Sequence, residues 1–534
     1  MKTRIPFIVL ALINCAFSFQ SLAQTAFISN KTLNDKIAGG WAGKMIGVTY
    51  GAPVEFRAQG VLFNDPISWK PADVSGSVWQ DDLYVQLTFL MTMDRYGINA
   101  PAKLFQELFA KSGYPLWHAN VQARKNYFDG IYPPESGGPE YNLHADDIDF
   151  QIEADYLGLM CPGMPATAAA MASRIGHIMN YGDGVYGGVF ISSLYTHAFF
   201  ENDIRKIITE ALLSIPAESD YAKTISDVIL LHSHYPSDWH SAWKELYEKW
   251  GNEHICEAGG TFNIDAKVNG AFVVMGLLYG EGDPLRTMEI TARCGQDADC
   301  NPSNAMAVLG VMKGFNALPA EYRQAVEAMG DSLFINTNYS FNKAVQQTAK
   351  YARELAVQNG GKPVNDGLEI KIQQPKPQPL EVAFPNLVFS KKVTVFENGD
   401  WNFKGNWQNY GNPKDRNQAK YSGTRGDEIS FSFMGTSVSL NGNWVKTGGK
   451  ADIYVDNIFK RTIDCYFNYA DQQHENMDIY HVLNLPEGKH NIRLVVKGEK
   501  RPESAGTDVC VWSAVVFKKG DKTDTGHTFS FQKK

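Results

Sequence analysis

The chain has 534 residues, of which 44% are apolar and 20% charged, and its formal net charge is -8. This length exceeds one ordinary domain and predicts two or three, each large enough to bury a core without a disulfide scaffold. The charge is spread along the chain and no basic patch stands out, which argues against nucleic acid as a partner.

The first 23 residues have the organisation of an export signal. Lys2 and Arg4 precede an apolar run over 5–19, and small residues follow at 21–23. A membrane anchor is the alternative, but the run is shorter than the roughly 20 residues that a spanning helix needs. The sequence therefore predicts a signal peptide over 1–23, a mature chain exported to the periplasm or the exterior, and no transmembrane segment after it.

Residues 24–361 carry the apolar spacing of helices. Apolar side chains recur three or four positions apart in stretches such as 83–93 and 272–278. The last helical pattern, near 342–358, is followed by Gly360, which can adopt the left-handed conformation that closes a helix. We therefore predict an all-α domain over this part of the chain.

The opening helix of this domain contains Gly39, Gly43 and Gly47, which lie on one face at intervals of four. Each glycine costs a helix about 1 kcal/mol relative to alanine. Very close approach of a neighbouring helix or loop is the compensation that we expect at this face.

A helix break follows at Gly51 and Pro53 and leaves Glu55 on a loop. Taken alone, Glu55 is most simply interpreted as a solvated side chain paired with Arg57. The sequence around it gives no separate indication of chemistry.

Two acidic clusters, Asp81-Asp82 and Asp297-x-Asp299, each come directly before a helical pattern, and Asn301 is the predicted cap of the second helix. Aspartate is common at helix starts because its carboxylate accepts backbone N–H bonds and faces the positive end of the helix dipole. Capping needs only one carboxylate, however, and each cluster has two. The pairs therefore also fit a shared acidic site.

Four converging carboxylates would repel strongly. Two charges about 4 Å apart repel by roughly 4 kcal/mol at an effective dielectric of about 20, so the site requires cations or raised pKa values. Oxygen-only ligands favour hard cations, which predicts one or two Mg²⁺ ions, with Mn²⁺ as the alternative. Zinc is disfavoured because the sequence has no His/Cys cluster with the usual spacing.

Residues 362–386 contain five prolines and predict a semi-extended linker. Over 387–520 the apolar period changes to two, as in 429–433, with glycine-containing turns between the apolar stretches. Short strands at this spacing predict a β-sandwich of the jelly-roll kind. Residues 521–534 form a predicted tail.

Six cysteines remain after removal of the predicted signal, in a compartment where disulfides can form. Cys465 and Cys510 lie in the same C-terminal domain. They either pair with each other or stay as free buried cysteines, and the sequence leaves both possibilities open.

In chain order, the helical features resemble the ADP-ribosylglycohydrolase family. The resemblance covers roughly residues 36–319 and consists of the small-residue helix with Glu55, the Gln80-Asp81-Asp82 segment, the acidic segment 146–153, the glycine-rich segment 182–188, the helix and turn over 269–283, and the segment 295–301. It implies an all-α fold with a two-magnesium centre that hydrolyses a glycosidic bond at the anomeric carbon of a ribose-like sugar.

The resemblance also implies roles for individual residues. Glu55 matches a carboxylate that acts at the scissile glycosidic bond. Gln80 and Cys300 stand where the family commonly has threonine ligands; the amide oxygen of Gln80 suits magnesium, whereas the thiol of Cys300 is a poor ligand. The family's metal-binding aspartates match Asp81, Asp82, Asp297 and Asp299, and the residues expected to contact substrate are Asp147, Asp149, Gly184, Tyr186, Gly187 and Asn269, with the glycines on a loop that receives a diphosphate.

The C-terminal domain resembles the galactose-binding-like sandwiches attached to secreted carbohydrate enzymes, through segments 433–438, 451–456 and 485–490. This implies a carbohydrate as a possible second ligand. Trp401, Trp407 and Tyr410 are candidates for stacking on sugar rings, although tryptophans near strands also serve as core residues.

Three functions remain open at this point. The first is hydrolysis of an ADP-ribosyl group, which the helical domain favours. The second is a secreted glycoside hydrolase that uses the same fold on a furanoside-containing glycan, which the export signal and the sandwich favour. The third is a non-catalytic glycan-binding protein.

Overall fold

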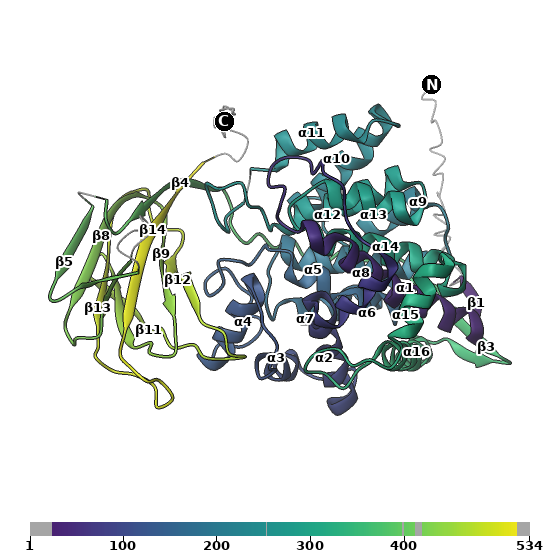
Figure 1. Cartoon of the computed structure of the whole chain (residues 1–534), viewed down its shortest axis with the longest axis horizontal. Coiled ribbons are helices and arrows are strands. Elements are labelled where there is room, and N and C mark those ends of the chain that lie inside the picture. Colours follow the sequence, from purple (N-terminus) through teal and green to yellow (C-terminus); the bar gives the residue numbers. More distant parts are fainter. Residues whose placement is uncertain (1–23, 253, 398–399, 412–418, 521–534) are drawn as a thin grey trace, which may run out of the picture.

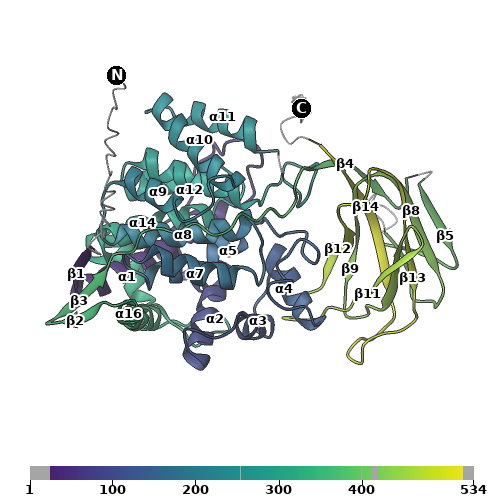
Figure 2. The ribbon, with the colours of Figure 1, turned by 180° about the vertical axis from the view of Figure 1, so that it is seen from behind.

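The computed structural model describes residues 24–252, 254–397, 400–411 and 419–520 (Figure 1). The predicted signal peptide over 1–23 and the predicted tail over 521–534 lie outside these residues. A helical domain is followed by a domain of antiparallel sheets, which confirms the predicted fold class (Figures 1 and 2). Among the described residues, no helix has the length and apolar character needed to cross a membrane.

The helical domain has a buried centre around α1, α12 and α14, in which nearly every side chain of α12 and of the second half of α1 is buried. In the described residues the α-helices are α1 Asn30–Gly51, α2 Asp81–Tyr96, α3 Ala102–Ala110, α4 His118–Phe128, α5 Asp149–Glu153, α6 Asp155–Leu159, α7 Pro165–Gly176, α8 Asp183–Ala198, α9 Ile204–Leu212, α10 Asp220–His234, α11 Trp239–Trp250, α12 Ala266–Gly280, α13 Pro284–Arg293, α14 Cys300–Lys313, α15 Ala320–Ala328 and α16 Phe341–Gln358, with short 3-10 helices η1 Ala52–Val54, η2 Pro71–Trp79 and η3 Phe315–Ala317.

The glycine face of α1 packs directly on α14, as the spacing of the glycines predicts. A Cβ atom on Gly39 would lie 2.1 Å from the carbonyl oxygen of Gly310, which is too close for any larger residue. The same contact continues to the end of α1, where a Cβ on Gly51 would lie 1.8 Å from the carbonyl oxygen of Ala298. The close packing therefore places the loop after α1 beside the acidic segment that precedes α14.

Helix α14 begins at Cys300, and its N-cap is Asp299, whose carboxylate accepts a hydrogen bond from the Cys300 amide at 2.8 Å. The cap predicted at Asn301 is therefore wrong by two residues. The Asn301 side chain instead donates to Asn269 Oδ1 at 2.9 Å. Asp299, one carboxylate of the predicted acidic pair, thus caps the N-terminus of α14.

A small antiparallel sheet adds to the helical domain. Strand β1 (Thr25–Ser29) pairs with β3 (Gly367–Lys371), which also pairs with β2 (Lys362–Val364). The start of the predicted linker over 362–386 is therefore a hairpin, which is a correction to the sequence prediction. These strands are too short, and β2 contains a proline, for the alternating pattern to be recognised.

The C-terminal domain is built from two antiparallel sheets, ordered β11-β10-β13-β8-β5 and β12-β9-β14-β7-β6, and β4 also pairs with β14. Alternate side chains such as Phe431 and Leu494 are buried between the sheets. Cys465 and Cys510 are both buried and free, so they are not bonded here. The strands are β4 Leu387–Thr394, β5 Trp401–Lys404, β6 Gln408–Tyr410, β7 Ala419–Ser422, β8 Glu428–Gly435, β9 Ser437–Trp444, β10 Lys450–Val455, β11 Ile458–Asp464, β12 His474–Val482, β13 Gly488–Val496 and β14 Val509–Lys519.

The sheet that contains β9 and β12 lies on the side of the helical domain, beside α4 (Figures 1 and 2). Arg501 bonds to Asp129 at 2.7 Å at the end of α4, and the rings of Phe128 and Tyr469 stack with centroids 3.8 Å apart. Just before α4, the Leu116 amide donates to Gln472 Oε1 of the sandwich at 3.0 Å. The sandwich therefore supports both ends of α4, the helix that begins at the wall of the site.

Candidate active site

A pocket of about 620 Å³ opens in the helical domain where the N-termini of α2 and α14 approach the loop after η1. Its lining combines acidic side chains with aromatic rings. The lining residues are Glu55, Phe56, Trp79, Gln80, Asp81, Trp117, His118, Ile148, Asp149, Ile152, Glu257, Phe262, Ile264, Asp297, Asp299 and Cys300.

The acidic residues predicted from the sequence meet here. Asp299 belongs to two groups of potential ligands, one with Asp82 and Cys300 and one with Glu55 and Asp297. Within each group the ligand atoms lie within 4.8 Å of one another. Asp81, the first residue of α2, lines the same pocket. Side chains that lie more than two hundred positions apart in the sequence thus form one acidic site.

This convergence raises the pKa values of the aspartates. Burial raises the pKa of Asp81 to about 8, and the charges of Asp82 and Asp299 add to the shift. Burial and the charge of Asp82 raise the pKa of Asp299 to about 6, and burial with the charge of Asp299 raises the pKa of Asp297 well above its ordinary value. Without a counter-charge the site holds protons, as the Coulomb repulsion of clustered carboxylates requires.

The donor set fits a hard divalent cation. Within the described part of the chain, Asp297 Oδ1 is buried and has no hydrogen-bond partner. A buried carboxylate oxygen left in this state is costly unless a cation or proton satisfies it. The surrounding ligands are mostly carboxylate oxygens, which Mg²⁺ and Mn²⁺ accept.

Cys300 and Gln80 differ in what they contribute. The Cys300 thiol donates to Asp82 Oδ2 at 2.9 Å, and burial raises the pKa of this thiol well above its ordinary value. Cys300 therefore supports a carboxylate as a neutral donor. Gln80 lies at the pocket wall, and its backbone carbonyl accepts hydrogen bonds from the first turn of α2.

Lys44 is a buried residue of the site region that the sequence argument missed. Its Nζ lies 2.9 Å from Asp82 Oδ1 and 3.0 Å from Asp155 Oδ2, and it donates to the Ile152 carbonyl at 2.7 Å. Only 1% of the side chain is exposed. A lysine among the small and apolar residues of this helix was the available signal. Lys44 fixes the orientation of Asp82 from behind the pocket.

Glu55 lies exposed at the mouth of the pocket, on the loop that follows η1. Desolvation of its carboxyl group raises the pKa of Glu55 to about 9, and the charges of Asp299 and Asp81 increase the shift. Arg57 does not neutralise it, because its guanidinium donates to the Pro53 carbonyl at 3.1 Å. The simple interpretation of Glu55 as half of a surface ion pair is therefore wrong.

Asp149 and Asp147 have different positions although they are two residues apart. Asp149 lines the pocket, and its carboxylate accepts from the backbone amides of Ala119 and Asn120 at 3.3 and 3.0 Å, which caps α4. Asp147 does not line the pocket; it lies behind the wall, 2.7 Å from His144. Of this predicted pair, only Asp149 faces the pocket.

The remaining predicted substrate contacts lie outside the pocket. Gly184 and Gly187 belong to α8 instead of a loop, where Gly184 packs on a backbone carbonyl and Gly187 on the Gln151 side chain. Tyr186 bonds through its hydroxyl to the Pro379 carbonyl at 2.7 Å. The linker thus covers this part of α8. The family motif predicted the order of these residues along the chain, but it did not predict that they are packed against other parts of the protein.

Asn269 is fully buried and does not line the pocket. Its Oδ1 accepts from Asn301 Nδ2 at 2.9 Å and from the Asp297 amide at 3.4 Å, and its Nδ2 donates to the Asp265 carbonyl at 2.9 Å. The side chain therefore positions the acidic segment before α14. This is a correction to the predicted contact with substrate.

Aromatic residues that the sequence did not single out also line the pocket. The rings of Phe56 and Phe262 lie 4.8 Å apart, and His118 stacks on Phe262 at 5.4 Å. Trp79 and Trp117 are unusually exposed for tryptophan, at 66% and 46%. Such rings offer apolar faces to a sugar. No spacing in the sequence separates them from core aromatics.

The raised pKa values of the aspartates give a pH prediction for metal-free protein. The folded-state pKa of Asp81 is about 8, against about 3.9 for an unfolded aspartate. The folded state therefore holds more protons, and its stability falls as the pH rises between these values.

Thermal unfolding in chelator should show this loss between about pH 5 and about pH 8, and excess Mg²⁺ should reduce it. Asp81→Asn should flatten the curve in chelator. The same slope in all three samples would show that the acidic site is not its source.

The family model described as ADP-ribosylglycohydrolase matches residues 29–357, which is more than half of the chain. The chain belongs to the ADP-ribosylglycohydrolase family. The description of this family names a glycohydrolase, and the described residues include candidate metal-binding groups.

Three individual likenesses accompany this match. A chain titled ADP-ribosylglycohydrolase-related protein complex covers 60% of this chain and 99% of its own length, with 13% identity and a TM-score of 0.44. The CBM36-1 domain of a multidomain xylanase from the hindgut metagenome of Trinervitermes trinervoides covers 24% of this chain and 98% of its own length, with 16% identity and a TM-score of 0.18.

The third likeness is to a curated protein, the A type blood alpha-D-galactosamine galactosaminidase of Flavonifractor plautii. It is 28% identical over 131 residues, which are 24% of this chain. The match spans 11% of that relative's length, so the two proteins share one segment only.

Proposed function

We propose that this chain is an exported, metal-dependent glycoside hydrolase that cleaves the bond at the anomeric carbon of a sugar with vicinal hydroxyls. The observation that carries the proposal is one pocket lined by Glu55, Asp81, Asp297 and Asp299 together with aromatic rings, with Asp82 grouped beside Asp299. Acidic ligands suit a cation that holds a diol, and aromatic walls suit the apolar face of the same sugar.

Magnesium is the cation that we propose, as one or two ions, with manganese as the alternative. Asp81, Asp82, Asp297 and Asp299 would hold it, and Gln80 lies within the same wall. When bound, the cation supplies positive charge for the sugar hydroxyls and for a water molecule. Lys44 and the Cys300 thiol hold Asp82 in position.

Glu55 is the proposed acid catalyst. Its carboxyl group lies at the mouth of the pocket, where a leaving group would depart, and its pKa is raised, which favours the protonated form. A protonated carboxyl at this place can donate its proton to the leaving oxygen. Asp149 contributes to the wall while it fixes the start of α4.

A glycan is favoured over an ADP-ribosyl group as substrate. The glycines expected to receive a diphosphate lie within α8 and face protein atoms, and Tyr186 is bonded to the linker. No predicted phosphate contact therefore reaches the pocket. The name of the Flavonifractor plautii relative also describes a glycosidase.

Hydrolysis of an ADP-ribosyl bond is the second candidate, because the family match covers the whole helical domain. The C-terminal sandwich is proposed to bind carbohydrate for an exported enzyme. The two tryptophans predicted to stack on sugar pack against their own domain. The ring centroids of Trp401 and Phe431 lie 4.5 Å apart, and the Trp407 indole N–H donates to the Glu428 carbonyl at 2.9 Å. We expect a sugar at another face of the sandwich.

Purified protein should be tested in Mg²⁺ against nitrophenyl furanosides, nitrophenyl hexosaminides and an ADP-ribosylated protein. The proposal predicts release of nitrophenol from at least one glycoside, lost in chelator and unaffected by added ADP-ribose. Release of ADP-ribose without turnover of glycosides would select the second candidate. Bound metal without turnover of any glycoside would favour a binding protein.

A further inference from the structure

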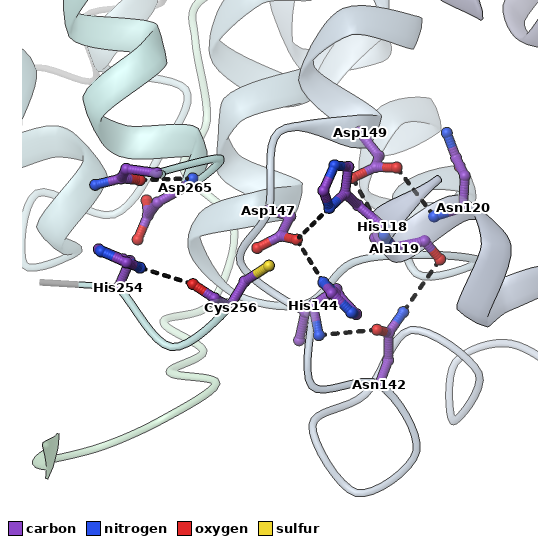
Figure 3. A network of polar contacts seen from close by, with 12 residues as sticks. His118, Ala119, Asn120, Asn142, His144, Asp147, Asp149, His254, Cys256 and Asp265 are labelled. Carbon is purple, nitrogen blue, oxygen red and sulfur yellow. Dashed lines mark hydrogen bonds and ion pairs between the residues drawn. The ribbon is translucent and has the colours of Figure 1, made fainter. Parts of the chain in front are cut away.

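We propose that His118, His144, Asp147 and Cys256 form a zinc site beside the acidic pocket, which His118 also lines. The four side chains come from three segments: the start of α4, the loop before α5 and the loop before α12. Their potential ligand atoms lie within 4.8 Å of one another, and Figure 3 shows them directed toward a common centre at Asp147. The spacing along the chain hides this cluster, which is why the sequence argued against zinc.

The distances fit four-coordinate zinc after small movements. Asp147 Oδ2 lies 2.7 Å from His144 Nδ1 and 4.0 Å from His118 Nδ1. Zinc bonds of about 2.0 to 2.3 Å in a tetrahedron place neighbouring ligand atoms about 3.3 to 3.6 Å apart. The first separation must open, and the second must shorten, by less than about 1 Å.

The second contact is too long for a hydrogen bond, so it leaves the His118 ring available. Among the described residues, no hydrogen bond to a ring nitrogen of His118 is found. The residue also has φ 43°, a backbone conformation that is uncommon for a side chain of this size. Figure 3 shows the His118 ring beside Asp147.

Hydrogen bonds to the backbone hold the three segments in place. Asn142 accepts from the His144 amide at 2.9 Å and donates to the Ala119 carbonyl at 3.3 Å, which joins both histidine segments (Figure 3). His254 bonds to the Cys256 carbonyl at 2.7 Å. Supports of this kind orient the ligands of metal sites.

The ligand chemistry distinguishes this cluster from the acidic pocket. A thiol and two imidazoles favour a borderline-soft cation such as Zn²⁺ and are poor ligands for Mg²⁺. Four protein ligands complete the coordination, which is the composition of a structural site. Asp147 and Cys256 are almost fully buried, at 1% and 3% exposure, which suits a retained ion.

The position of the cluster suggests a structural role for the ion. His118 also lines the acidic pocket, while His144 and Cys256 line a second cavity shared with sandwich residues such as His474. A zinc ion here would hold together the start of α4 and the loops before α5 and α12, which lie between the pocket and the sandwich. The proposal does not depend on the substrate or on the magnesium site.

Cobalt titration of metal-stripped full-length protein tests the proposal, with excess Mg²⁺ present to fill the acidic pocket. We expect one equivalent of Co²⁺ to produce a thiolate-to-cobalt charge-transfer band in the near ultraviolet, and one equivalent of Zn²⁺ to remove it. Cys256→Ser should lose the band. His118→Asn, a change at the pocket surface, should weaken cobalt binding by at least the roughly 10- to 100-fold that loss of an outer-shell partner costs.

Cys300→Ser is the matched control, because its thiol belongs to the acidic pocket, and it should keep the band. Cys161→Ser, at a buried cysteine outside both clusters, should also keep it. No band in the parent protein would overturn the proposal. A band that survives Cys256→Ser but disappears in Cys300→Ser would move the thiolate site to the acidic pocket and would equally overturn it.

Discussion

Glu55→Gln should lower kcat on the cleaved glycoside by about 10²- to 10⁴-fold, the range for loss of a general acid. Glutamine keeps the size of the side chain but cannot donate an acidic proton to the leaving oxygen. Metal binding should remain, because the four aspartates are unchanged. Steady-state kinetics with glycosides of increasingly acidic leaving groups measure the effect, and the loss should shrink as the leaving group becomes better.

Arg57→Ala is the control for this experiment. Arg57 is exposed on the same loop, where its guanidinium donates to the Pro53 carbonyl and lies over the Phe63 ring, so its loss should leave kcat close to that of the parent. A Glu55→Gln enzyme that turns over every glycoside at the parent rate would remove Glu55 from the chemistry. Equal losses in both variants would point to damage of the loop.

Lys44→Met should destabilise the metal-free protein by roughly 3–5 kcal/mol, the cost of removing one partner from a buried ion pair. The ammonium lies 2.9 Å from Asp82 and 3.0 Å from Asp155, and neither carboxylate is exposed to water. Methionine fills a similar volume, so the loss reports the unpaired charges. Urea unfolding monitored by circular dichroism measures the free energy of unfolding.

Lys36→Met gives the matched comparison on the same helix. Lys36 Nζ donates to the carbonyls of Val311 and Met312 at 2.9 Å, and its replacement leaves no buried carboxylate unpaired. We expect a smaller loss, about 1–3 kcal/mol. If Lys36→Met cost as much as Lys44→Met, the balance of charge behind Asp82 would not be the reason for the effect.

Local sequence patterns predicted the parts of the fold that depend on local physics. The glycines at intervals of four predicted the close contact that a Cβ on Gly39 would break. The apolar spacing after Asp82 predicted α2, and the change to a period of two predicted the sandwich. The acidic pairs predicted a shared site because their number exceeded what two helix caps need.

Features that depend on distant segments were not predictable in the same way. The hairpin of β2 and β3 exists because β1, more than three hundred residues earlier, offers an edge. Asn269 and Asp147 were placed at the substrate because a motif records order along the chain and not depth. His118 and Cys256 carry no motif, and only the folded chain brings them together.

The most direct test of the central claim is the anomalous X-ray signal of Mn²⁺ in crystals of the full chain grown with that ion. We predict a peak bound by carboxylate oxygens of Asp82, Asp297 and Asp299, at the bottom of the pocket whose mouth holds Glu55. Crystals that show these carboxylates together without a peak, or a peak held by other residues, would contradict the proposed chemistry.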